Sequence, residues 1–122
     1  MARARNLRGG PRLVRQLLGL ACSVSVICAA PSFAGTAASG SINTVLPHSG
    51  GVMIFNQTGT RTGRPACSTQ DRWAINGTTD GGKIIISTLL TAYAQGKQIS
   101  IQGTGTCTAW SDTETVDYII VP

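Results

Sequence analysis

The sequence has 122 residues, of which 42% are hydrophobic and only 12% are charged, with 10 Lys and Arg against 5 Asp and Glu. Five of those cations are arginines between Arg3 and Arg15, so residues 35–122 carry five cations and five anions, a net charge of 5 − 5 = 0. This balance excludes the basic stripe with which proteins follow a nucleic-acid backbone. The same residues are enough for one domain with a modest core.

The first 34 residues have the three zones of a cleavable signal peptide. Residues 1–16 are basic, residues 17–30 are apolar, and Pro31 precedes Ser32-Phe33-Ala34, which places small residues at the −3 and −1 positions before Gly35. A transmembrane anchor is the alternative, but the apolar run is shorter than the ~20 residues that cross a bilayer. We therefore expect a signal peptide at 1–34 and a single secreted or periplasmic domain at 35–122, with no membrane span after cleavage.

Cysteine usage supports export. Cys22 and Cys28 leave with the signal peptide, so that Cys67 and Cys107 remain. In an oxidising compartment such a pair most simply forms one disulfide. Two cysteines 40 residues apart and the single His48 make a poor ligand set, so we expect no metal and no cofactor.

The first half of the domain predicts short strands separated by turns. Residues 35–40 are small and polar and predict a loose N-terminus, before a weak strand at 42–46. The apolar run at 52–55 predicts a buried strand. A turn-rich loop at 58–65 precedes a third strand at 66–75.

The clearest element is a helix that begins at Asp80 as its cap and ends before Gly96. Ile85, Leu89 and Tyr93 repeat at i, i+4 and i+8, which is typical of a buried helix face. The β-prone isoleucines at 84–86 leave a short strand as the alternative.

Two strands follow the helix. Residues 98–102 alternate as a half-buried strand, 103–106 form a turn or bulge, and 111–115 form a polar loop. Residues 116–121 predict the last strand, with Val116, Tyr118 and Ile120 on one face. The order of elements predicts a mainly β fold, with one helix packed on a small OB-like antiparallel barrel or sheet.

The chain carries no strong catalytic motif. His48 and Ser49 are adjacent, and adjacent residues of an extended segment point to opposite faces. Asp112 and Glu114, with Asp117 nearby, form the only carboxylate cluster, which a hydrolase or a Ca²⁺ site would use. A solvated loop is the favoured interpretation, because carboxylates mostly stay on the surface. The chain is therefore not expected to be an enzyme.

The two tryptophans lie close in sequence to the two cysteines. Trp73 follows Cys67 by six residues and is expected in the core. Trp110 follows Cys107 by three residues, among polar neighbours, and is the better candidate for an exposed ring that stacks on a sugar.

From Cys67 onward the segments CSTQDRW, AYAQGK, ISIQGTGTC and WSDTETVDYI resemble receptor-binding B subunits of the subtilase-cytotoxin and pertussis-like toxin group. The resemblance implies an OB-fold that assembles into a ring, usually a pentamer, binds sialylated glycans and partners a catalytic toxin A subunit. It also implies a sugar-contacting serine, for which Ser49 is a nearby candidate, and an aromatic residue on the strand after the helix that is absent here.

The leading hypothesis is a secreted, non-enzymatic module, toxin B-subunit-like, that binds a glycan or another cell-surface ligand through Ser49, Trp110, Asp112 and Glu114. The second is a secreted protein-interaction or inhibitor module without a carbohydrate ligand, in which a sheet edge engages another protein. The third is a small hydrolase that uses Asp112 and Glu114.

Overall fold

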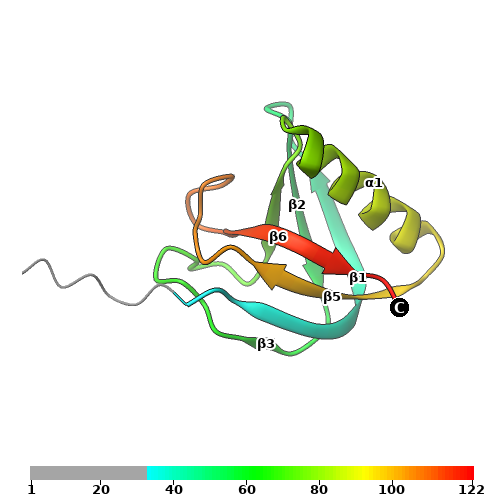
Figure 1. The fold of residues 1–122 in the computed structure, drawn as a ribbon, viewed down its shortest axis with the longest axis horizontal. Helices are drawn as coiled ribbons and strands as arrows, with labels where there is room; N and C mark the ends of the chain where they lie inside the picture. The colour runs from blue at the N-terminus through cyan, green and yellow to red at the C-terminus, as the bar shows by residue number, and fades with distance from the viewer. Residues whose placement is uncertain (1–32) are drawn as a thin grey trace, which may run out of the picture.

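The computed structural model describes residues 33–122, so the predicted signal peptide, apart from Phe33 and Ala34, lies outside the described residues, as do Cys22 and Cys28. Within the described part the chain forms six strands and one helix (Figure 1). In chain order they are β1 (Thr36–Pro47), β2 (Val52–Gln57), β3 (Arg61–Thr62), β4 (Trp73–Asn76), α1 (Asp80–Ala94), β5 (Gln98–Gly103) and β6 (Glu114–Ile120).

The strands close into a ring. Their order is β2-β4-β6-β5-β1-β3, and an additional β2–β1 pairing joins the two sides. All pairs are antiparallel except β4–β6, which is parallel at Trp73 and Glu114. A five-stranded ring with short β3 on the outside and a helix between β4 and β5 confirms the predicted OB-like barrel.

The core fills the inside of the barrel and the space beneath α1, which lies across one end (Figure 1). Its largest fully buried members are Phe55, Ile75, Leu89 and Ile99, with Trp73 only 3% exposed. Each such side chain contributes roughly 1.5–3 kcal/mol through burial. The prediction that Trp73 belongs to the core is confirmed.

The prediction of a loose segment at 35–40 is wrong, because strand β1 already begins at Thr36. Its first half pairs with β5 and β3, and its second half, from Ile42, pairs with β2. Small residues allow this double pairing, because the neighbouring backbone comes very close to β1. A Cβ on Gly40, for example, would lie 2.7 Å from the Cα of Gly59. A sequence of small polar residues therefore forms the long bent strand that closes the barrel.

The helix is confirmed over Asp80–Ala94, and the alternative strand at 84–86 is wrong. Its cap is Thr79 rather than Asp80, since the Thr79 hydroxyl accepts the hydrogen bond from Gly82 N at 3.1 Å. Gly96 has φ +63°, as expected for the residue that ends a helix. Leu89 is buried, whereas Tyr93 is 47% exposed, so the buried face is rotated away from Tyr93.

Two strand boundaries also differ from the prediction. The expected strand at 66–75 is a strand only over Trp73–Asn76, because residues before it form a loop tied to other parts of the chain. The last strand begins at Glu114, and Val116 is buried whereas Tyr118 and Ile120 are exposed. Val116 therefore faces the core and Tyr118 faces outward. The register of the β5–β6 pairing shifts between Gln102 and Gly103, where this change occurs.

Candidate functional site

Two loops at one end of the barrel form a single cross-linked unit. The predicted Cys67–Cys107 disulfide is present, with an S–S distance of 2.07 Å. It joins the loop at 63–72 to the loop at 104–113. The backbone N–H groups of Thr69 and Gln70 add hydrogen bonds to the carbonyl oxygen of Asp112, both at 3.1 Å. Disulfides of this kind are typical of oxidising compartments.

The loop at 104–113 lies beside the outer face of β4. Ile54 and Ala74 are completely buried, yet they alternate with core residues of these strands and therefore point outward. The loop is anchored beside them, because Thr115, which pairs with Ala74, accepts a hydrogen bond from Ala109 N at 2.9 Å. This is the face that many OB-folds use for oligonucleotides and oligosaccharides, and here Ile54 and Ala74 on it are closed to solvent.

The structure brings three of the predicted ligand-binding residues to this loop surface. Trp110 is partly exposed, and its ring lies 4.5 Å from that of His48. Ser49 is exposed in the turn that follows His48. Asp112 pairs with Arg72 at 3.0 Å, and hydrogen bonds from Thr113 and Arg72 lower the pKa of its carboxyl group. The loop surface therefore holds an aromatic ring, a hydroxyl and an ion pair.

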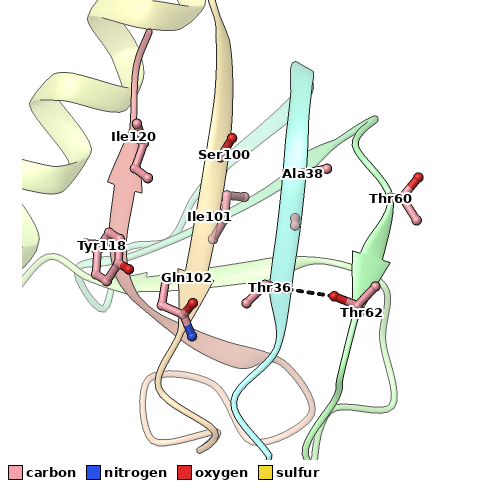
Figure 2. A pocket seen from close by; sticks show the side chains of 10 residues that line it. Thr36, Ala38, Thr60, Thr62, Ser100, Ile101, Gln102, Tyr118 and Ile120 are labelled. Carbon is pink, nitrogen blue, oxygen red and sulfur yellow. Dashed lines mark hydrogen bonds between the residues drawn. The ribbon is translucent and has the colours of Figure 1, made fainter.

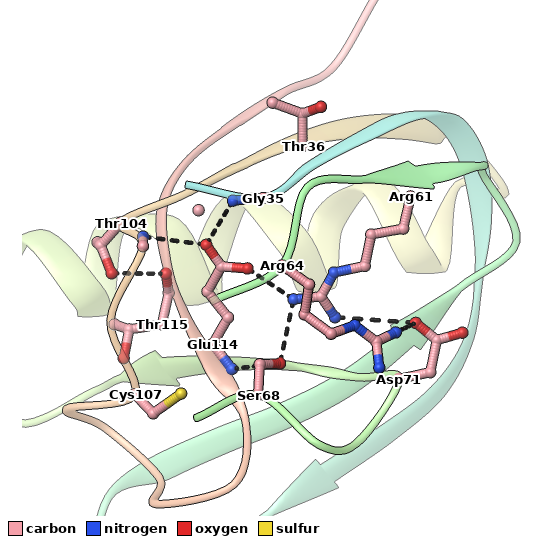
Figure 3. Close-up of polar contacts among 12 residues, drawn as sticks. Gly35, Thr36, Arg61, Arg64, Ser68, Asp71, Thr104, Cys107, Glu114 and Thr115 are labelled. Atoms are coloured by element: carbon pink, nitrogen blue, oxygen red, sulfur yellow. Dashed lines mark hydrogen bonds and ion pairs between the residues drawn. The ribbon is translucent and has the colours of Figure 1, made fainter. Parts of the chain in front are cut away.

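Glu114 does not join that surface. The solvated role expected for it is wrong, since its side chain is completely buried and out of reach of an external ligand. Its Oε1 accepts hydrogen bonds from Gly35 N at 2.7 Å and Gly105 N at 3.0 Å (Figure 3). Its Oε2 pairs with Arg61 at 2.6 Å. Asp112 forms an ion pair with Arg72, and Glu114 forms one with Arg61. The two carboxylates therefore do not form a catalytic pair.

Arg61 is the partner that sequence reasoning missed. Its guanidinium lies 3.9 Å from the centre of the Trp73 ring, a cation–π contact, and donates to Arg72 O at 3.1 Å. Its Nε is buried and has no hydrogen-bond partner in the described part of the chain. The loop at 58–65 showed turn formers but no periodicity that would place an arginine inside.

An open hollow lies elsewhere, on the outer face of β3, β1, β5 and β6 (Figure 2), and has a volume of about 380 Å³. Strand pairing arranges its walls in two rows. One row contains Tyr118, Gln102, Thr36 and Thr62, and the other contains Ile120, Ser100, Ala38 and Thr60. Neighbouring strands are about 4.8 Å apart, so each row is roughly 14 Å long.

The hollow combines one aromatic ring with neutral polar groups. Tyr118 is 48% exposed, and the hydroxyls of Thr36 and Thr62 are hydrogen bonded to each other at 2.7 Å. No hydrogen bond within the described residues occupies the hydroxyls of Ser100 or Tyr118. No charged side chain lines this hollow in the described part of the chain.

The sequence pattern led to no predicted site on this face, although one part of the pattern does indicate it. The alternation at 98–102 puts Ser100 and Gln102 on the face opposite Ile99 and Ile101. The contribution of Thr36 was hidden, because strand β1 begins earlier than its residues suggest.

Among residues 33–122, no cluster of three or more His, Cys, Asp or Glu side chains has a metal-binding arrangement. Within the same range, none of the helical structure combines the length and apolar character needed to span a bilayer.

Neither a protein-family model, nor a curated protein, nor a solved structure matches this chain. The resemblance to toxin B subunits, with the pentamer and the A subunit that it implies, therefore stays a prediction.

Proposed function

We propose that this chain is a secreted, non-enzymatic module that binds a neutral glycan in the hollow formed by β1, β3, β5 and β6. The observation that carries the proposal is the row in which Tyr118 stands beside Gln102, Thr36 and Thr62. An aromatic ring stacks against the CH-rich face of a sugar, while amide and hydroxyl groups bond its hydroxyls. A row about 14 Å long accommodates two hexose rings.

The charge of the hollow favours neutral sugars over sialic acid. A carboxylate ligand is usually held by a cation, and among residues 33–122 only neutral side chains line the hollow. Export to the cell exterior or periplasm fits this ligand class, and the disulfide supports an oxidising compartment.

Binding of the purified domain to an array of neutral and sialylated glycans tests the proposal. We expect binding to neutral hexose-containing glycans, and a loss of about tenfold in affinity for Tyr118→Ala, which corresponds to 1.4 kcal/mol. Tyr93→Ala is the matched control, because Tyr93 is 47% exposed but lies on α1. Equal binding by both variants, or binding that only Trp110→Ala abolishes, would place the ligand elsewhere.

Self-association across the same face is the second candidate, favoured by the exposure of Tyr118 and Ile120 on β6. Light scattering separates the two proposals. A stable oligomer that Ile120→Ser dissociates, with no glycan bound, would favour an interface between copies.

A further inference from the structure

The amide of Gly35 is buried next to the charged carboxylate of Glu114. Gly35 is buried, although Ala34 and Phe33 before it are exposed. Its nitrogen donates to Glu114 Oε1 at 2.7 Å (Figure 3), and its carbonyl accepts from Gly103 N at 2.7 Å. The chain therefore enters the fold at this residue.

The space around Gly35 fits only glycine. A Cβ there would overlap a carboxylate oxygen of Glu114 and lie 2.8 Å from the carbonyl oxygen of Gly63. A Cβ on Gly103 would overlap the other carboxylate oxygen. The buried carboxylate is thus enclosed by two glycines, one of which follows the predicted cleavage site directly.

We propose that cleavage between Ala34 and Gly35 creates an α-ammonium group that forms a buried salt bridge with Glu114. Water adds across the peptide bond, catalysed by a protease of the signal-peptidase class. Ala34 leaves with a carboxylate, and Gly35 keeps an amine that is protonated at neutral pH. A hydrogen bond in which only the acceptor is charged becomes a contact between opposite charges, which adds a Coulomb attraction to it. The inference rests on the predicted export signal and not on glycan binding.

The proposed salt bridge requires cleavage directly before Gly35. Loss of residues beyond Gly35 would remove Thr36 and Ala37, which pair with β5 and β3. Cleavage farther upstream would keep the hydrogen bond to Glu114 but not the charge. Since Ala34 is exposed, its removal opens one side of the new ammonium to water, which limits the desolvation cost.

The charged groups around the new terminus come from three parts of the chain. Glu114 of β6 contacts Gly35, and Arg61 of β3 lies on the other carboxylate oxygen. Behind Arg61, Asp71 is 3.8 Å from Arg61 and 2.7 Å from Arg64. The direct contact with Glu114 outweighs the more distant Arg61, whose charge Asp71 partly balances. The pKa of the α-amino group should therefore be higher in the folded than in the unfolded protein.

The test uses the full chain, exported by its own signal from a bacterial host and purified from the exported fraction. Intact mass should correspond to residues 35–122. With ¹³C-labelled glycine, the Gly35 Cα shift followed from pH 6 to 10 should give an apparent pKa at least one unit higher in the folded protein than in 8 M urea. One unit is a tenfold change in the folding equilibrium constant.

Because the folded pKa is raised, this stabilisation is fully present below the unfolded value of about 7.7 and is lost as the pH rises through the folded value. A different N-terminal residue, or the same pKa in folded and unfolded protein, would overturn the proposal. Both results are independent of whether any glycan binds.

Discussion

Replacement of Glu114 by Gln tests the buried ion pair most sharply. The carboxylate is completely buried and accepts from Gly35, Gly105 and Arg61. Gln has almost the same shape but removes the charge and turns one acceptor oxygen into an NH₂ donor facing the guanidinium. Since the Arg61 side chain is only 8% exposed, its charge would keep only the exposed Asp71, 3.8 Å away, as a counter-ion. Loss of one partner of a buried pair costs about 3–5 kcal/mol.

A double-mutant cycle separates the pair from the packing around it. Arg61→Met alone leaves a buried carboxylate without its cation and should cost a similar amount. The double variant Arg61→Met/Glu114→Gln leaves neither charge unpaired, so its cost should be at least about 1 kcal/mol smaller than the sum of the single costs. Asp112→Asn is the control, because the Arg72–Asp112 pair is 27% and 38% exposed and, like other solvent-exposed ion pairs, should contribute little to stability.

Urea denaturation followed by the fluorescence of Trp73 and Trp110 measures these costs. For a domain of this size, the expected loss for Glu114→Gln is a large part of a total of about 5–15 kcal/mol, and it lowers the melting temperature by at least about 12 °C. If Glu114→Gln costs no more than Asp112→Asn, the reasoning from burial is refuted.

Three further predictions concern stability. Replacement of both Cys67 and Cys107 by Ser should cost about 4 kcal/mol in urea denaturation, because the disulfide closes a loop of 40 residues; an unchanged midpoint would contradict this. Thr79→Ala should cost about 1 kcal/mol through loss of the helix cap, and its melting temperature should fall further than that of Thr78→Ala, which loses only an exposed hydrogen bond to Asn76 Oδ1; equal losses would contradict the assigned cap. Because the pKa of Asp112 is lowered in the folded state, its contribution is present above the unfolded pKa of about 3.9 and is lost as the pH falls through the folded value. Asp112→Asn should therefore be less stable than the wild type at pH 7, the gap should narrow as the pH falls below the unfolded pKa, and a gap that does not change with pH would exclude this origin.

The sequence predicted those elements whose signal is local. The helix, the buried strand at 52–55 and the alternating strand at 98–102 each have a period or cap that a few neighbouring residues determine. The disulfide followed from the small number of cysteines that remain after residue 34. The cap is Thr79 and not Asp80. Both residue types suit that position, and only the backbone conformation distinguishes them.

The parts that the sequence did not predict depend on distant partners. Strand β1 begins at Thr36 because β3 and β5 pair with it, and nothing in its own small residues indicates this. Glu114 looked like a surface carboxylate because Arg61, its partner, is 53 residues away. The hollow beside Tyr118 needs four strands in register, which local patterns do not specify.

Mapping of the bound glycan on the folded domain tests the central claim most directly. In a ¹H–¹⁵N titration with a neutral oligosaccharide selected from the array, the account predicts that the amides of Ser100, Gln102 and Tyr118 shift, while those of His48 and Trp110 stay in place. No shift with any array glycan, or shifts confined to His48 and Trp110, would contradict it.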